Sequence, residues 1–374
     1  MKKTFISASV ASVLALASFG ALAEGPSFYG RLELALTHTD TAATLQGGTN
    51  GIDTKNYADE NNAGTYLENN FSLLGVKGSE KIADGFEAIY QMEFQVENTS
   101  TTGDVFKARN TYLGLKTNAG TVLVGRNDTV FKQAEGGVDI FGNTNADIDR
   151  LISAQTRSAD GVWYYSPKIA GLVTLNATYL FDDNNDSTTD GQKTNESLYA
   201  LSATLGDKAF KDQNYYVAVA YNKGIAGVDA YRGVAQVKLG QFKVGGLFQQ
   251  SEDVVNSDID GNTYFVNVSY DLNGVNLKAE YGFDDAGFGN YYKNVNKYTV
   301  ITQGTDGKDI ITAKSWSGTD ISVQNFNVGA DYRLAKSTMV YGQYAMYRGD
   351  HVVAGNKVDL QDDNVFSVGV RYDF

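Results

Sequence analysis

Apolar and polar side chains alternate one by one along most of this chain, and this period of two constrains the fold more than any other feature. Successive side chains of an extended strand point to opposite faces, so the alternation predicts strands with one apolar and one polar face. It is clear over residues 86–97, 215–221, 264–272 and 275–283. In the first of these, the apolar face carries Phe86, Ala88, Tyr90, Met92, Phe94 and Val96, and the polar face carries Glu87, Gln91, Glu93, Gln95 and Glu97. Clusters of Gly, Asn and Asp separate segments of about 10 residues, which is typical of strands that cross a membrane as a barrel.

A soluble antiparallel sandwich would alternate in the same way, so alternation alone does not distinguish it from a membrane barrel. The connections between strands do distinguish them. Short and long polar connections alternate along the chain, as expected for a barrel with tight turns at one end and long loops at the other. The short connections are residues 206–213, 240–241, 273–274 and 335–337. The long ones are residues 39–65, 182–195, 251–262, 284–320 and 349–362. We therefore predict an all-β fold, a transmembrane antiparallel β-barrel of about 16 strands, which is the size at which a barrel encloses water.

The composition supports paired strands and excludes other classes of protein. The 374 residues include 24 Tyr and 19 Phe but only 2 Pro and no Cys, so the fold depends on backbone pairing and packing without disulfides or thiolate metal sites. The net charge of −13 disfavours binding to nucleic acid.

The first residues have the organisation of a secretory signal. Lys2 and Lys3 precede an apolar stretch over residues 5–22, and the small residues Ala21 and Ala23 suit a cleavage site. We expect a cleaved signal peptide over residues 1–23, followed by a single barrel domain over residues 24–374. After the signal, no apolar run in the sequence approaches the roughly 18 residues that a membrane helix needs.

The C-terminal segment also alternates, and it ends on an aromatic residue. Its apolar face carries Phe366, Val368, Val370, Tyr372 and Phe374. Left unpaired, such a strand would be an edge open to mispairing. We expect it to pair with the first strand, residues 28–37, and so to close the cylinder.

Five short motifs, in the same order, resemble the general, non-specific trimeric porins of Gram-negative outer membranes. They are residues 28–31 (FYGR), 75–80 (GVKGSE), 120–126 (GTVLVGR), 164–167 (YYSP) and 370–374 (VRYDF). The resemblance implies an outer-membrane channel for passive diffusion of small hydrophilic solutes and ions rather than an enzyme, with no cofactor and no metal. It also implies a homotrimer, contacts with outer-membrane lipid and lipopolysaccharide, and recognition of Tyr372 and Phe374 by the barrel-assembly machinery.

In that family a third loop folds into the barrel and narrows the pore, with acids on the loop facing basic residues on the wall. Carried over by position, the loop is residues 131–155. Its acidic side is Asp139, Asp147 and Asp149, and the basic wall is Arg31, Arg109, Arg126 and Arg157. Opposed rows of charge across a wet gap order water and penalise apolar solutes. The simpler alternative is that these arginines only pair with neighbouring carboxylates, which contributes little at exposed positions.

The sequence departs from the family at two places near this constriction. Leu73 occupies a wall position that is basic in some members, and residues 139–142 lack the Pro-Glu that precedes the family's Phe-Gly. Together with the acidic loops, the uncharged Leu73 indicates weak cation selectivity.

Other functions stay open as alternatives. A channel that prefers one substrate, and a plugged barrel with a structural or adhesive role, would share this sequence pattern. Catalysis has little support, because the two histidines, His38 and His351, have no compelling serine partner. Alternating oxygen-bearing side chains at residues 182–186 and 256–260 resemble calcium loops, but the second lacks the closing Glu of an EF-hand.

Overall fold

The computed structural model of the protein describes residues 23–46, 62–99, 103–181, 188–189, 192–193, 197–303, 309–315 and 318–374. The expected signal peptide, apart from Ala23, and most of the expected loop over residues 182–195 lie outside the described residues. No helix in these described ranges is long and apolar enough to cross a membrane.

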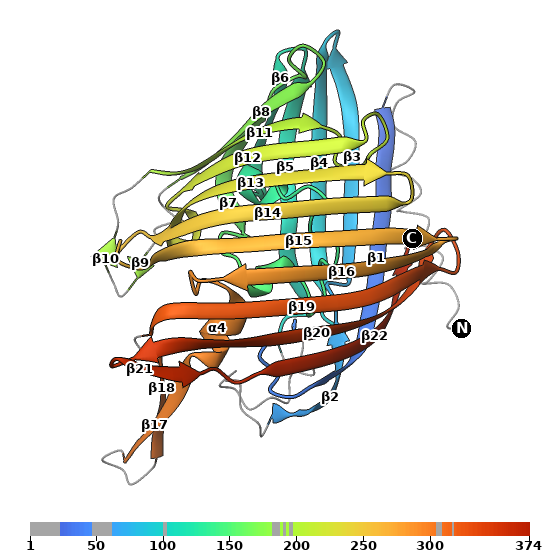
Figure 1. The fold of residues 1–374 in the computed structure, drawn as a ribbon. Coiled ribbons are helices and arrows are strands. Elements are labelled where there is room, and N and C mark those ends of the chain that lie inside the picture. The colour runs from blue at the N-terminus through green and yellow to red at the C-terminus, as the bar shows by residue number, and fades with distance from the viewer. Residues whose placement is uncertain are drawn as a thin grey trace, which may run out of the picture.

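Most of the described strands form one antiparallel sheet that closes into a barrel (Figure 1). In chain order its 18 segments are β1 (Ala23–Thr39), β2 (Gly64–Asn69), β3 (Leu73–Ala83), β4 (Phe86–Val96), β5 (Phe106–Thr117), β6 (Gly120–Asp128), β7 (Arg157–Tyr165), β8 (Val173–Leu180), β11 (Leu198–Gly206), β12 (Tyr215–Lys223), β13 (Val228–Leu239), β14 (Phe242–Asp253), β15 (Asp260–Leu272), β16 (Val275–Asp284), β19 (Thr319–Arg333), β20 (Thr338–Val353), β21 (Asn356–Asp359) and β22 (Asp363–Asp373). Because β2 and β3 both pair with β1, and β21 and β22 both pair with β20, these segments make 16 barrel strands. The expected β-barrel is confirmed.

The first and last strands close the barrel. β1 pairs with β22 from Arg31, opposite Asp373, to Thr39, opposite Val365. Gly30 and Phe374 continue this pairing with two backbone hydrogen bonds, of 2.9 and 3.1 Å. The expected pairing of the C-terminal strand with the first strand is confirmed, and it satisfies the backbone groups that an open edge would leave exposed.

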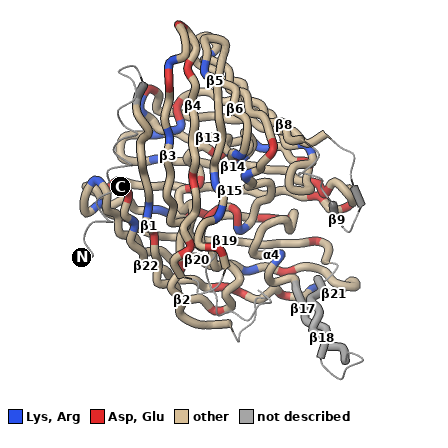
Figure 2. The backbone as a smooth tube through the Cα atoms, turned by 180° about the vertical axis from the view of Figure 1, so that it is seen from behind, with Lys and Arg blue, Asp and Glu red and all other residues tan. Residues whose placement is uncertain are grey.

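Strand alternation puts apolar side chains outside and polar or small side chains inside. Along β15, Tyr264 and Val266 are exposed, whereas Asn267 and Ser269 are buried. The outer face of β15 therefore suits contact with lipid hydrocarbon, and its inner face suits a polar interior. Figure 2 shows the view from behind, where charges of both signs are interspersed along the strands rather than gathered by sign in one region.

The turns at one end of the barrel are short, as expected. Residues 240–241 link β13 to β14, and residues 273–274 link β15 to β16. Asn273 and Gly274 both have positive φ angles, 53° and 95°, as a type I′ turn requires. The twist of that turn matches the right-handed twist of the two strands that it joins.

The connections at the other end hold more structure than expected. β14 continues to Asp253 and β15 begins at Asp260, so this loop is shorter than residues 251–262. The expected loop over residues 349–362 includes a hairpin of β20 with β21. Strand pairing therefore continues beyond the apolar belt, into polar sequence that alternation alone did not mark as strand.

Two small hairpins and one helix also lie in the long connections. The hairpins are β9 (Thr188–Thr189) with β10 (Gln192–Lys193), and β17 (Lys297–Gln303) with β18 (Asp309–Ser315). The helix is α4 (Asn290–Val295), which lies in the connection between β16 and β19.

Candidate functional site

The loop between β6 and β7 folds into the barrel. It contains α2 (Val130–Gln133) and a short 3-10 helix, η3 (Ile148–Arg150). Asn267 of β15 donates a hydrogen bond of 2.6 Å to the Val138 carbonyl, and Tyr347 of β20 donates one of 2.8 Å to the Asn145 carbonyl. The third loop therefore reaches strands far from the two that carry it, as expected for residues 131–155.

A buried polar cluster fixes the tip of the third loop. The Asn145 amide donates to Glu68 Oε1 at 3.3 Å and to the Thr44 carbonyl at 3.2 Å, and its oxygen accepts from the Ser367 hydroxyl at 3.0 Å. These partners come from β2, from the segment after β1 and from β22. Hydrogen bonds between buried groups are stronger than hydrogen bonds exposed to water, so these contacts hold the loop tip in place.

α4 enters the barrel from the end with the long connections and packs on the third loop. Gly289, next to α4, lies so close to the backbone of Arg150 and Leu151 that a side chain would not fit there. Tyr291 is fully buried and donates a hydrogen bond of 2.6 Å to the Gln361 carbonyl. The long polar connection expected over residues 284–320 therefore includes a helix that packs against the third loop.

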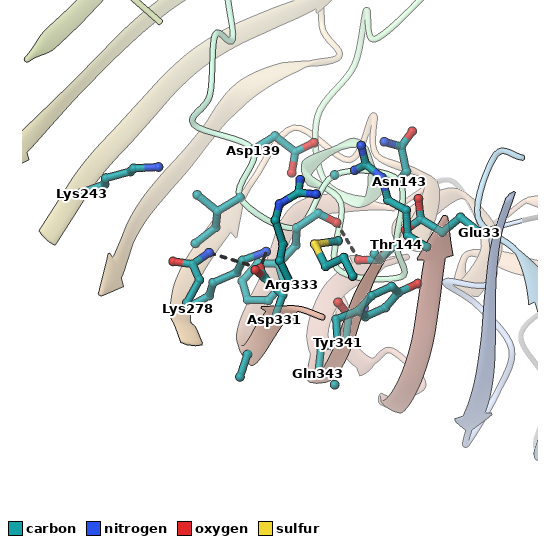
Figure 3. A pocket seen from close by; sticks show the side chains of 18 of the residues that line it. Glu33, Asp139, Asn143, Thr144, Lys243, Lys278, Asp331, Arg333, Tyr341 and Gln343 are labelled. Carbon is teal, nitrogen blue, oxygen red and sulfur yellow. Dashed lines mark hydrogen bonds and ion pairs between the residues drawn. The ribbon is translucent and has the colours of Figure 1, made fainter. Parts of the chain in front are cut away.

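A cavity of about 570 Å³, here called the chamber, lies beside the tip of the third loop, towards the short turns. Residues 135–144 of the loop form one side, and β1, β14, β16, β19, β20 and β22 form the other. Its charged lining consists of the acids Glu33, Glu135, Asp139 and Asp331 and the bases Lys243, Lys278, Arg333 and Arg371. In Figure 3, Asp139 projects from the loop, and Arg333 extends from the wall towards the loop.

Some of these charges are paired and others are not. Lys278 Nζ lies 2.6 Å from Asp331 Oδ2, and Arg371 Nε lies 2.9 Å from Asp373 Oδ2. Within the described part of the chain, neither Lys243 nor Arg333 forms an ion pair. These two cations can therefore interact with a passing solute without first breaking an ion pair.

Three of the four expected basic wall residues lie inside the barrel, each beside a carboxylate. Arg31 Nε is 2.8 Å from Asp373, Arg109 Nε is 2.7 Å from Glu93, and Arg157 Nη2 is 3.1 Å from Asp128. The simpler alternative, in which these arginines pair with neighbouring carboxylates, therefore describes their contacts. A paired arginine still presents its remaining donors to the lumen.

Arg126 lies where the regular alternation of β6 ends. Val122 and Val124 are exposed and Leu123 is buried, but Gly125 has a positive φ of 126°, and the pairing of β6 with β7 shifts register between Gly125 and Asn127. Arg126 itself is half-buried, with a buried Nε atom. Its place on the basic wall stays a prediction.

The three expected loop acids have different surroundings. Asp139 lines the chamber. Asp147 caps η3, accepting from the Asp149 amide at 2.9 Å and the Asn143 amide at 2.7 Å. Asp149 Oδ1 lies 3.1 Å from Arg150 Nε in the same loop. Only Asp139 thus faces the chamber.

Sequence analysis missed several charged residues of the chamber. They are Glu33, Glu135, Asp331, Lys243, Lys278, Arg333 and Arg371. Four of them are basic residues near the short turns, and this is the only sequence feature that could have indicated them. The sequence does not show where the tip of the third loop lies, so it does not show which wall residues face that tip.

Neither histidine lies in the chamber. His38 Nδ1 is 3.1 Å from the Thr65 hydroxyl, and His351 Nδ1 is 3.1 Å from the Tyr292 hydroxyl. Among the residues that the structure describes, no group of three or more His, Cys, Asp or Glu is arranged to hold a metal ion.

Comparison with known proteins agrees with the fold. The family model described as Gram-negative porin matches residues 8–352. Major outer membrane protein P.IA of Neisseria meningitidis serogroup B is 24% identical over 326 residues, covering 81% of each chain. Outer membrane porin protein OmpD of Citrobacter koseri is 24% identical over 324 residues, covering 81% of this chain and 85% of OmpD.

Solved structures share the fold at lower identity. The anion-selective porin from Comamonas acidovorans has a TM-score of 0.66 at 17% identity, covering 94% of this chain and 99% of that chain. OmpT of Vibrio cholerae in its trimer form has a TM-score of 0.56 at 18% identity, covering 93% and 99%. The family match spans most of the chain, and the barrel fold agrees with it. The chain therefore belongs to the Gram-negative porin family, whose members are passive channels of the outer membrane rather than enzymes.

Proposed function

We propose that this porin passes small hydrophilic solutes and ions by diffusion, with a weak preference for cations. The observation that carries the proposal is the chamber, where four acids and four bases line a polar space of about 570 Å³ between the third loop and the wall. Charges facing each other across such a gap orient water and polar solutes, whereas an apolar solute gains nothing in exchange for the water that it displaces.

The sign of the ion preference follows from charge beyond the chamber. The chamber itself is balanced, so it favours neither sign when all eight groups are ionised. The whole chain carries a net charge of −13, which raises the local concentration of cations at the channel mouths. A small excess of cation current is the expected result.

Recording from purified protein in a planar lipid bilayer tests both parts of this proposal. Diffusion through an open pore should give large ohmic current steps, and a potassium chloride gradient should give a reversal potential that indicates cation preference. The Comamonas porin is described as anion-selective, so the opposite sign is a real alternative, and it would overturn the ion preference.

The same recordings separate the two alternative functions. Current that saturates with one sugar or ion would favour a substrate-preferring channel. The packing of α4 against the third loop supports that alternative. Absence of conductance would favour a plugged barrel with a structural or adhesive role.

We further propose a constriction in a trimeric assembly, with Asp139 on the loop and a basic wall formed by Arg31, Arg109, Arg126 and Arg157. The Vibrio OmpT structure, which is described as a trimer form, supports that assembly. Light scattering of the purified protein, corrected for detergent, should give three times the mass of one chain. Contacts with lipopolysaccharide and recognition of Tyr372 and Phe374 by the barrel-assembly machinery belong to the same proposal.

A further inference from the structure

One arginine of the barrel wall contacts both ends of the third loop. Arg232 lies on β13, and it is only 3% exposed. Its guanidinium bonds to Phe131, near the start of the loop, and to Ser153 and Gln155, near the end. A single side chain therefore joins both stems of the loop to the wall.

Every N–H donor of this guanidinium has an acceptor. Nε donates to Gln249 Oε1 at 2.9 Å, and Nη2 donates to the same oxygen at 2.6 Å and to the Ser153 carbonyl at 3.5 Å. Nη1 donates to the Phe131 carbonyl at 3.1 Å and to Gln155 Oε1 at 2.9 Å. A guanidinium has five donors in a fixed plane, so this arrangement fixes direction as well as distance, and lysine could not reproduce it.

The charge of Arg232 is held without an ion pair. Within the described residues no carboxylate lies within ion-pairing distance of it, and its acceptors are amide and carbonyl oxygens. The guanidinium carbon also lies 4.1 Å from the centre of the Phe131 ring, a cation–π contact. A buried cation is costly unless its donors are satisfied, so displacing the loop from this arginine is unfavourable.

Gln155 continues the connection from Arg232 to the chamber. Its Nε2 donates a short hydrogen bond to Glu135 Oε2, and Glu135 lines the chamber. Ser153 gives the end of the loop a further link to the wall, because its hydroxyl lies 2.9 Å from the Ser251 hydroxyl on β14.

We propose that Arg232 is the positioning residue of the constriction: it fixes both stems of the third loop and, through Gln155, sets the Glu135 carboxylate at the chamber. This inference rests on the proposed function, because it takes the third loop as the element that narrows the pore. It goes beyond that function by naming a residue that touches no solute and yet determines the width and charge of the gap.

Single-channel recording of Arg232→Met tests the proposal. Methionine keeps most of the side-chain volume and removes all five donors, so the loop should move and the mean conductance and open-channel noise should rise about twofold. Arg348→Met is the matched control, since Arg348 is exposed on β20, and it should record like the wild type. Arg232→Lys, which keeps the charge but not the planar donors, should lie between the two.

A reversible cross-link separates loop position from general damage. The chain has no cysteine, so Ser153→Cys with Ser251→Cys introduces a single pair, at positions where the hydroxyls lie 2.9 Å apart. In the Arg232→Met background, oxidation of this pair should return conductance and noise to wild-type values, and a reductant should raise them again. Wild-type currents in Arg232→Met, or unchanged noise after thiol labelling has shown that the disulfide formed, would overturn the proposal.

Two further outcomes are also decisive. If Arg232→Met does not assemble, Gln155→Leu removes the link to Glu135 together with one of the acceptors of Arg232, and it should lower the cation preference. An unchanged reversal potential in that variant would contradict the positioning role. A wild-type protein that gives no ohmic conductance would contradict the proposed channel function instead, so the two failures are distinguishable.

Discussion

Asp139 projects into the chamber with a buried carboxyl group that has other carboxylates around it. Burial raises its pKa well above the usual range, and Asp147 and Glu135 raise it further. Burial also raises the pKa of Asp149 to about 7, although Arg150 opposes this shift. Both groups therefore become charged only as the pH rises towards neutrality or beyond, and the loop's contribution to selectivity depends on pH.

Lowering the pH from about 8 to about 5 should reduce the cation preference of the channel, because carboxyl groups with raised pKa values are neutral at the lower pH. The same shift means that the packed loop binds these protons more tightly than an unpacked loop, so loop packing weakens as the pH rises through the raised pKa values. Reversal potentials measured across this range check the prediction. Asp139→Asn should show a smaller pH dependence than the wild type, and a preference that grows on acidification would contradict the assignment.

Gly30 lies where the first strand, β1, pairs with the C-terminal strand, β22, and the absence of a side chain matters at this position. A Cβ atom there would overlap the ring of Phe374. Gly30→Ala should therefore destabilise closure by about 1–3 kcal/mol, as overpacking does elsewhere. The fraction of protein that migrates as folded barrel on unheated gels should fall. Gly25→Ala is the matched control, since nothing lies within 4 Å of a Cβ atom built at Gly25. Equal folded fractions for the two variants would show that the ring adjusts freely.

The face of the barrel to which a residue points was predictable from the sequence where strand alternation alone determines it. Arg31 lies on the polar face of an alternating strand, and that face does point inward. Alternation does not decide the direction of Arg126, because Gly125 has a positive φ angle and the pairing of β6 with β7 shifts register beside it. Lys243 and Arg333 could not be found, because their place in the chamber depends on where the third loop ends.

Among the elements, strands were predictable and α4 was not. A period of two is a local property that can be read from adjacent residues, so β15 and its neighbours follow directly from alternation. α4 has only 6 residues, too few to show a helical repeat. It is held by contacts with Arg150, Leu151 and Gln361, which are distant in sequence. Tertiary contacts of this kind leave no local pattern.

Tyr291→Ala should detach α4 from the third loop. Truncating a fully buried aromatic side chain costs about 3–5 kcal/mol, and it also removes the hydrogen bond to Gln361. Uptake of larger sugars in a liposome-swelling assay should then increase. Tyr291→Phe removes only the hydroxyl that bonds to Gln361, and it should cost about 1 kcal/mol and change uptake little. Identical uptake by Tyr291→Ala and the wild type would place α4 outside the solute path.

At the scale of the whole molecule, the barrel has two surfaces with opposite tolerance to charge. Val266 lies at the middle of β15 and is 59% exposed on the outer face. Val266→Lys should destabilise the barrel by about 2–4 kcal/mol, because the ammonium group would lie in hydrocarbon. Asn276→Lys adds the same charge to the chamber lining and should leave stability nearly unchanged. Unfolding by urea in lipid vesicles compares the two variants, and equal losses would contradict the assignment of inner and outer faces.

The hydrogen bond between Arg31 and Asp373 joins residues 342 positions apart, across the pairing of β1 with β22. Contacts this distant in sequence form slowly, because the chain between them must already be ordered. Until they form, both strands present unpaired amides that hydrocarbon cannot satisfy. We therefore expect the pairing of β1 with β22 to be a slow step of assembly. A defect in this pairing should then lower the number of completed pores while leaving the current of each completed pore normal.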